Sequence, residues 1–217
     1  MNNNFFTIAI DGESASGKTT GSKFIAKNFG FKILSSGKLY RYLALCILKN
    51  NGKYNYNFIN KVAKNISLKK LSSNHLYSPK VTKLASIIAK KKYVRFSLKK
   101  FQKNFIKKNR KIIIEGRDIA SKIMPNADLK IFFKCSTKEK AKRRLKEFNK
   151  NNKNIKLKEL EKSLKLRDFN DKNRKESPLL FVKGAVLVDT TNLSISDLED
   201  KLTKLVRKAV NNKYGNL

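Results

Sequence analysis

Histidine and cysteine are scarce in this sequence of 217 residues, and their scarcity excludes several classes of enzyme. The one histidine, His75, is too few for a histidine-based zinc site, and nothing around it suggests a Ser-His-Asp hydrolase. The two cysteines, Cys46 and Cys135, lie far apart and form no metal-ligand or redox pattern. We therefore expect a reduced, cytoplasmic protein.

Long apolar stretches are missing as well. No run approaches the roughly 20 residues that span a bilayer, and residues 1–5 lack the basic start and apolar segment of a signal peptide. We expect neither a membrane span nor a membrane partner. The length suits one substantial core with a small insertion, and a hydrophobic content of 40% argues against wholesale disorder.

Acidic residues are few, since 16 Asp and Glu stand against 51 Lys and Arg and the net charge is +35. Such a charge suggests nucleic-acid binding. However, only 9 of the basic residues are Arg, 24 residues are Asn, and the lysines are spread along the whole chain. Because Lys, Asn, Ile, Phe and Tyr belong to A/T-rich codons, we favour nucleotide bias and expect no specific nucleic-acid partner. Each retained Arg then indicates a need for a planar, bidentate guanidinium.

Short apolar runs alternate with helical segments, and this alternation predicts a parallel α/β sheet with helices on its faces. The polar stretch from about 50 to 77 is expected to belong to an insertion, and the Asn- and Lys-rich run 149–158 to be mobile and solvated. Strands are expected at 5–10, 32–35, 111–115, 129–133 and 185–189, and helices at about 18–29, 39–48, 137–149, 157–172 and 196–211.

The strongest chemical signal is Gly-Glu-Ser-Ala-Ser-Gly-Lys-Thr at 12–19, which matches G-x-x-x-x-G-K-(S/T) between a predicted strand and a predicted helix. Backbone N–H groups of such a loop surround phosphates, and the helix N-terminus adds a favourable dipole. We expect Lys18 to reach the β- and γ-phosphates of ATP and Thr19 to bind Mg²⁺. The expected ATP-binding residues of this segment are Gly12, Glu13, Ser14, Ala15, Ser16, Gly17, Lys18, Thr19 and Thr20.

Three further polar clusters lie along the chain. Ser-Ser-Gly-Lys-Leu-Tyr-Arg at 35–41 follows the second predicted strand, and Glu-Gly-Arg-Asp at 115–118 follows the third. Because parallel strands end at one edge of a sheet, these two clusters and the loop are expected to face the same space. The third cluster is Arg-Asp-Phe-Asn-Asp-Lys-Asn-Arg at 167–174. Through these clusters and the segment Asp-Thr-Thr-Asn-Leu-Ser-Ile at 189–195, the sequence resembles the bacterial cytidylate kinases over nearly its whole length.

That family consists of P-loop nucleoside monophosphate kinases, and the resemblance implies both a fold and a reaction. The implied fold is a five-stranded parallel sheet flanked by helices, with its core at about 1–35, 111–149 and 180–217. A small insertion at about 36–110 would bind the monophosphate, and a lid would lie at about 150–179. The implied reaction transfers the γ-phosphoryl group of ATP to CMP or dCMP with Mg²⁺, in pyrimidine nucleotide metabolism. We expect a monomer.

The resemblance assigns phosphate-binding roles to several of the arginines. Arg41, Arg117 and Arg174 would hold the monophosphate and the transferred group, and with Lys18 they form the expected catalytic set. Arg143 would lie near the ATP phosphates or the adenine. Such a set is reasonable because phosphoryl transfer spreads charge over several oxygens and leaves little covalent work for the protein.

The resemblance also implies an acceptor site and a metal contact. Cytosine offers an exocyclic amine beside acceptors at N3 and O2, so a carboxylate and a guanidinium suit it. Ribose contacts from the lid are expected from Arg167 and Asp171, and Glu115 is expected to orient Mg²⁺ through water. The residues expected to read the base are Ser36, Ser86, Arg95 and Asp118.

Several positions depart from the family pattern. Ser35 replaces the usual Asp after the second strand, and we hypothesise that this relaxes the discrimination between ribose and deoxyribose. Ala120-Ser121 replaces Gly-Thr, Tyr77 stands where Arg is common, and the insertion is shortened between 71 and 79. The choice between CMP and dCMP therefore stays open.

Two other functions also stay open. The first is another monophosphate kinase, for UMP or dTMP, against which Asp118 together with Arg95 argues. The second is a basic RNA-binding protein on a nucleotide-binding scaffold, which would be expected to show clustered aromatic residues beside its lysines.

Overall fold

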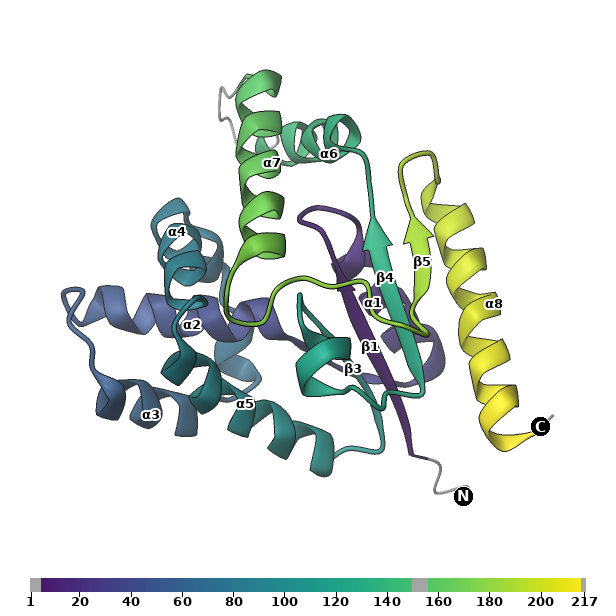
Figure 1. The fold of residues 1–217 in the computed structure, drawn as a ribbon, viewed down its shortest axis with the longest axis horizontal. Coiled ribbons are helices and arrows are strands. Elements are labelled where there is room, and N and C mark those ends of the chain that lie inside the picture. Colours follow the sequence, from purple (N-terminus) through teal and green to yellow (C-terminus); the bar gives the residue numbers. More distant parts are fainter. Residues whose placement is uncertain (1–4, 150–155, 216–217) are drawn as a thin grey trace. The chain divides into compact units, whose positions relative to one another are not determined.

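The computed structural model describes residues 5–149 and 156–215, and they divide into two compact units (Figure 1). One unit comprises Met1–Leu34 and Arg110–Leu217, and the other comprises Ser35–Asn109. Most of the run 149–158, which was expected to be mobile, lies outside the described residues, and Leu157 at its end begins a helix.

A five-stranded parallel sheet forms the centre of the first unit, as the sequence predicted, in the order β2-β3-β1-β4-β5. Ile8 in the central strand pairs with Ile113 on one side and with Leu129 on the other. The chain therefore continues to opposite sides of β1, and the carboxyl end of that strand is the switch point where α/β sheets bind ligands. The strands are β1 (Phe6–Gly12), β2 (Lys32–Ser35), β3 (Lys111–Glu115), β4 (Leu129–Lys134) and β5 (Val186–Asp189).

Two helices, α1 (Lys18–Phe29) and α8 (Ile195–Tyr214), share one hydrophobic core with the sheet. Side chains alternate across a strand, so every second residue of β1 and β4 contributes to this core, Phe133 among them. Gly21 lets α1 approach closely, because an added Cβ would lie 2.8 Å from Cζ of Phe133. This packing fixes the start of α1 over the end of β1.

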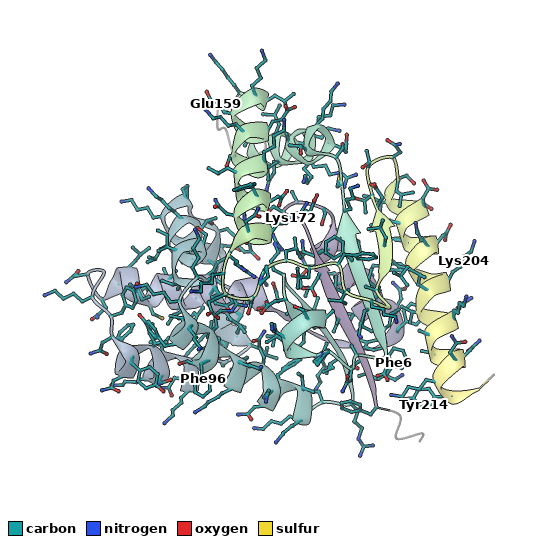
Figure 2. All side chains as sticks on the ribbon, viewed as in Figure 1. Phe6, Phe96, Glu159, Lys172, Lys204 and Tyr214 are labelled. Carbon is teal, nitrogen blue, oxygen red and sulfur yellow. The ribbon has the colours of Figure 1, made fainter. Side chains whose placement is uncertain are left out.

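The ends of α8 are both tied down. Ser194 and Asp197 form a capping box at its start, each side chain accepting from the backbone N–H of the other. At its end, the side chains of Lys213 and Tyr214 donate hydrogen bonds to the carbonyl of Phe5. The Tyr214 ring lies beside Phe6, with centroids 6.3 Å apart (Figure 2).

Helices α6 (Thr137–Asn149) and α7 (Leu157–Asn173) complete the first unit beyond the sheet. They pack on each other through a small apolar cluster that contains Ala141, Leu160 and Leu164. A π-helical turn, η3 (Ile119–Ile123), follows the end of β3. Among the described residues, none of the helices has the length and apolar character needed to cross a membrane.

The second unit is helical. The polar stretch 50–77, in which the sequence indicated little pattern, forms helix α3 (Tyr56–Lys64) and two short 3₁₀ turns, η1 (Lys69–Ser72) and η2 (Asn74–Tyr77). Ile59 and Ala63 of α3 are buried. Helix α2 begins at Ser36, three residues before the expected start at 39, and the buried Ser36 hydroxyl accepts a hydrogen bond from the Gln102 side chain. The elements are α2 (Ser36–Lys49), α3 (Tyr56–Lys64), η1 (Lys69–Ser72), η2 (Asn74–Tyr77), α4 (Pro79–Ile88) and α5 (Lys92–Lys107).

Candidate active site

The loop at 13–17 joins the central strand β1 to the start of α1. It requires glycine at its first bend, because Gly12 has φ +145° and a Cβ there would lie 2.1 Å from the carbonyl oxygen of Phe133. Ala15 and Gly17 also have positive φ, at 54° and 88°. Alternating left-handed residues turn successive backbone N–H groups inward, which is the geometry of an anion-binding nest.

Lys18 is the first residue of α1, and its side chain is buried against the loop. Its ammonium donates to the carbonyl of Glu13, which also accepts from the Ser16 hydroxyl at 2.9 Å. Burial lowers the pKa of Lys18 well below its ordinary value, and the nearby Arg117 and Arg167 charges lower it further. A phosphate anion beside Lys18 would supply the missing counter-charge.

Glu115 ends β3 with its carboxylate turned to α1. The hydroxyl of Thr19 lies 3.0 Å from each carboxylate oxygen, and the Ser22 hydroxyl lies 3.5 Å from one of them. A hydroxyl and a carboxylate are oxygen ligands suited to Mg²⁺, which ordinarily keeps several waters and phosphate oxygens. Within the described part of the chain no three His, Cys, Asp or Glu side chains gather around a metal position, so phosphates and water would complete the shell.

Asp11, a residue the sequence analysis did not single out, supports the turn after β3. Its carboxylate accepts from the backbone N–H groups of Ile119 and Ala120 at 2.9 and 2.7 Å. Burial raises the pKa of Asp11 to about 6. These bonds hold the turn on which the buried Asp118 stands. An acid at the end of a buried strand was the signal in the sequence.

Arg117 joins the phosphate loop to α7. It donates to the Ser14 hydroxyl at 3.0 Å and pairs with Asp171 at 2.8 Å, while Arg174 approaches Asp171 at 3.4 Å. Although burial raises the pKa of Asp171, the charges of Arg117, Arg174 and Arg167 hold it below its ordinary value. The structure thus brings Arg117, Asp171 and Arg174 together beside the loop.

Arg143 reaches the loop through an intermediary. Its guanidinium donates to the hydroxyl and the carbonyl of Thr190 at 3.0 and 2.6 Å, and the Thr190 hydroxyl donates to the carbonyl of Ser16 at 3.1 Å. Thr190 was not predicted as a site residue, although the segment 189–195 was part of the family resemblance.

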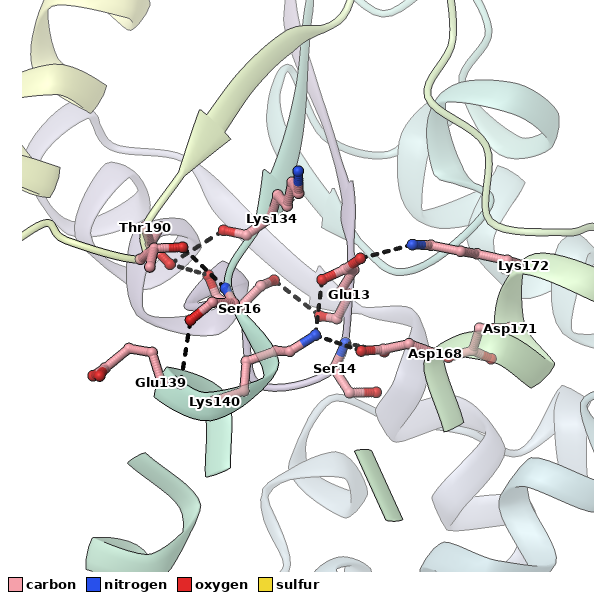
Figure 3. A network of polar contacts seen from close by, with 12 residues as sticks. Glu13, Ser14, Ser16, Lys134, Glu139, Lys140, Asp168, Asp171, Lys172 and Thr190 are labelled. Atoms are coloured by element: carbon pink, nitrogen blue, oxygen red, sulfur yellow. Dashed lines mark hydrogen bonds and ion pairs between the residues drawn. The ribbon is translucent and has the colours of Figure 1, made fainter. Parts of the chain in front are cut away.

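Three charged residues around Glu13 were also missed. Lys140 of α6 and Lys172 of α7 pair with its carboxylate, and Lys140 pairs with Asp168 (Figure 3). Asp168 and Lys172 lie in the cluster 167–174 that was part of the family resemblance, but nothing local in the sequence connects the lysines with Glu13, because Lys140 and Lys172 lie 127 and 159 residues from it.

The predicted acceptor residues of the second unit lie on three of its helices. The Arg41 guanidinium of α2 lies over the ring of Tyr77, with 4.8 Å between Cζ and the centroid. Arg95 of α5 lies 5.5 Å from the ring centroid of Tyr40 and donates to the carbonyl of Ala89. Aromatic faces of this kind hold a guanidinium plane in a fixed orientation.

The two predicted serines of this unit differ. Ser36 is buried at the start of α2, whereas Ser86 is exposed on α4 and donates to the carbonyl of Lys83 within its own helix at 2.7 Å. The Ser86 oxygen can still accept a hydrogen bond while its proton is donated to that carbonyl, and its role as a base contact stays a prediction.

A loop of this geometry with acids and arginines around it agrees with the resemblance, and comparison with known families decides the matter. The family model described as cytidylate kinase matches residues 8–208. The chain belongs to the cytidylate kinase family. It is accordingly an ATP-dependent nucleoside monophosphate kinase.

Curated cytidylate kinases agree over nearly the full length. That of Fusobacterium nucleatum subsp. nucleatum is 37% identical over 212 residues, covering 93% of this chain and 97% of the relative. That of Thermosipho melanesiensis is 36% identical over 210 residues, covering 93% and 96%. A solved structure of an uncharacterized protein from Eubacterium ventriosum superposes with a TM-score of 0.52 at 13% identity, covering 94% and 98%, and supports the fold alone.

Proposed function

We propose that this cytidylate kinase transfers the γ-phosphoryl group of ATP to CMP or dCMP, forming ADP and CDP or dCDP, in pyrimidine nucleotide metabolism in the cytoplasm. The observation that carries the proposal is the buried Lys18 at the start of α1, inside a phosphate-binding loop of a chain from this family. The loop N–H groups and Lys18 would hold the phosphates of ATP.

Phosphoryl transfer requires little of the protein beyond binding and orienting the two substrates. The attacking oxygen belongs to the phosphate of the acceptor, which is already ionised, so in-line transfer requires no general base. Mg²⁺ would be held by Thr19 directly and by Glu115 through water, and it supplies neutralisation of charge on the phosphate oxygens. Arg143, fixed by Thr190, would lie at the ATP side of the loop.

Charge on the transferred group would be stabilised by arginines. Arg117 and Arg174 share Asp171, so their guanidiniums are oriented before substrate binds. Arg41, oriented by Tyr77, would hold the phosphate of the monophosphate acceptor. Because each of these guanidiniums is already restrained, less conformational entropy is lost when a phosphate binds.

The residues proposed to read the acceptor base are Ser36, Ser86, Arg95 and Asp118. Arg167 and Asp171 would contact the ribose from a lid at about 150–179, and the insertion at about 36–110 would bind the monophosphate. A carboxylate accepts from the cytosine amine and opposes the carbonyl that uracil carries at the same place.

The decisive experiment is a coupled assay with ATP and each of CMP, dCMP, UMP and dTMP. We expect ADP formation with CMP and dCMP and little with the other two. Comparable kcat/KM for UMP or dTMP would replace the cytosine assignment. A Ser35→Asp variant tests the sugar hypothesis, since an unchanged ratio of CMP to dCMP efficiency would remove it.

A further inference from the structure

An acidic side chain, Glu13, stands inside the loop that we propose holds the phosphates of ATP. A carboxylate in this place opposes an anionic ligand unless its own charge is compensated. Glu13 is buried, and its two oxygens pair with lysines from different helices. One lies 2.8 Å from Nζ of Lys140 on α6, and the other lies 2.8 Å from Nζ of Lys172 on α7 (Figure 3).

Asp168 of α7 closes this arrangement. Its Oδ2 lies 2.6 Å from Nζ of Lys140, and its Oδ1 accepts from the backbone N–H of Ser14 at 2.8 Å. The four charged side chains, which we call the Glu13 cluster (Glu13, Lys140, Asp168 and Lys172), carry two charges of each sign and are neutral together. The cluster therefore connects two successive residues of the phosphate loop to two helices.

The cluster keeps Glu13 and Lys140 ionised although both are buried. Burial raises the pKa of Glu13, but the two lysines hold it below its ordinary value. Burial lowers the pKa of Lys140, but Asp168 and Glu13 hold it above its ordinary value. Each partner thus supplies the charge that makes the other's burial tolerable.

Helix α7 carries two neighbouring stripes of polar residues. Asp168 and Lys172 are four residues apart, so they share the stripe that contacts the loop. Arg167 and Asp171, also four residues apart, share the adjacent stripe and are proposed to contact the ribose, and Arg174 follows directly after the last residue of α7. Because both stripes belong to one helix, contacts that fix the first also fix the second.

We infer that Glu13 is a positioning residue, which sets the place of α7 relative to the phosphate loop through the Glu13 cluster. The inference rests on the proposed roles of the α7 residues. Its two lysines differ: Lys140 is 2% exposed, while the Lys172 side chain is 50% exposed. The pair of Glu13 with Lys140 is therefore shielded from water, whereas the pair with Lys172 is screened by solvent and contributes less.

The test compares Glu13→Gln and Lys172→Gln with Lys165→Gln, a matched loss of one positive charge at an exposed site of α7. For Glu13→Gln we expect kcat/KM for CMP to fall on the order of ten- to hundredfold, since a misplacement of about 1 Å can have that effect. The dissociation constant for ATP should stay within about threefold, because the loop N–H groups and Lys18 remain. Lys172→Gln should lower kcat/KM for CMP about two- to fivefold, as for a half-exposed ion pair.

The double variant of Glu13→Gln and Lys172→Gln should be no worse than Glu13→Gln alone, because partners in one network are not additive. Equal losses of ATP binding and of transfer in Glu13→Gln would assign Glu13 to donor binding and overturn the inference. The inference would also be overturned if kcat/KM for CMP of Glu13→Gln and of Lys172→Gln equalled that of Lys165→Gln. If Glu13→Gln shows no thermal unfolding transition and is therefore not folded, the test is decided by kcat/KM for CMP of Lys172→Gln, an exposed site, compared with that of Lys165→Gln. A wild-type protein that phosphorylates no nucleoside monophosphate would instead refute the proposed function.

Discussion

The hydroxyl of Thr19 lies 3.0 Å from both carboxylate oxygens of Glu115, so the first turn of α1 and the last residue of β3 present oxygen ligands at one point. If Glu115 orients Mg²⁺ through water, Glu115→Gln should raise the Mg²⁺ concentration needed for half-maximal activity on the order of ten- to hundredfold. A Mg²⁺ titration of turnover measures this. Asp200→Asn, an exposed acid on α8, is the control and should not shift the curve.

Lys18→Ala should abolish phosphoryl transfer and leave the fold intact, because the ammonium is a point charge for phosphates rather than a packing element. Its burial in the free protein even disfavours the charged form, as the lowered pKa of Lys18 indicates. Turnover and the thermal unfolding midpoint should both be measured. A folded Lys18→Ala protein that keeps most of the wild-type turnover contradicts the assignment of the loop.

Base specificity should depend on Asp118 more than on the phosphate-binding arginines. Asp118→Asn supplies an amide that can donate or accept, so kcat/KM for CMP should fall. The ratio of kcat/KM for CMP to kcat/KM for UMP should also fall, by a factor that corresponds to a free energy on the order of 1–3 kcal/mol. Arg41→Lys should slow both acceptors about equally, because both lose the same bidentate clamp. An unchanged ratio in Asp118→Asn would leave the acceptor base unassigned.

Tyr77 should act through its ring, 4.8 Å from Cζ of Arg41. Tyr77→Ala should raise KM for CMP about two- to fivefold, as expected for a cation–π contact at an exposed site. Tyr77→Phe keeps the ring and should behave as wild type, and KM for ATP should not change in either variant. Since Tyr77 is 53% exposed, neither substitution should affect stability. Equal effects of Ala and Phe would indicate that the hydroxyl matters instead.

Asp11 should make stability depend on pH in a window set by its burial. Its pKa of about 6 in the folded protein lies above the ordinary 3.8, so the folded state binds this proton more tightly than the unfolded state does. Stability should therefore fall as pH rises from about 4 to about 6, by up to about 3 kcal/mol. Asp11→Asn also loses one acceptor for a backbone N–H, but that loss does not vary with pH.

The free energy of unfolding of the wild type and of Asp11→Asn is measured by urea titration across the range from pH 4 to pH 6, and the two values are compared at each pH. The difference, wild type minus variant, should decline with rising pH. A difference that stays constant between pH 4 and pH 6 would show that the Asp11 carboxyl titrates as it does in the unfolded chain.

Much of the fold could be predicted because its signals are local. The run of Ile112, Ile113 and Ile114 is apolar enough to identify a strand buried on both faces, and the phosphate loop has its sequence motif between a strand and a helix. Helices α3, α4 and α5 were not predicted. In α3 the buried residues Ile59 and Ala63 do recur at helical spacing, but the helix has only nine residues and stands among many Asn and Lys residues.

The site was harder to predict, because its contacts join residues far apart in the chain. Lys140 resembles an ordinary surface charge in the sequence of a highly basic protein, and the cluster 167–174 does not show which partner Asp168 has. Only the packing of α6 on α7 places the two beside Glu13. The raised pKa of Asp11 likewise depends on its burial in the folded protein, which no local pattern shows.

The hydrogen bonds from Lys213 and Tyr214 to the carbonyl of Phe5 have a consequence for how the chain folds as it is synthesised. The strand that carries the phosphate loop, β1, is synthesised long before α8, which is part of its hydrophobic cover. An emerging chain therefore cannot finish its nucleotide-binding edge from the N-terminal end alone. We therefore expect ATP to stabilise this protein fully only after α8 has left the ribosome.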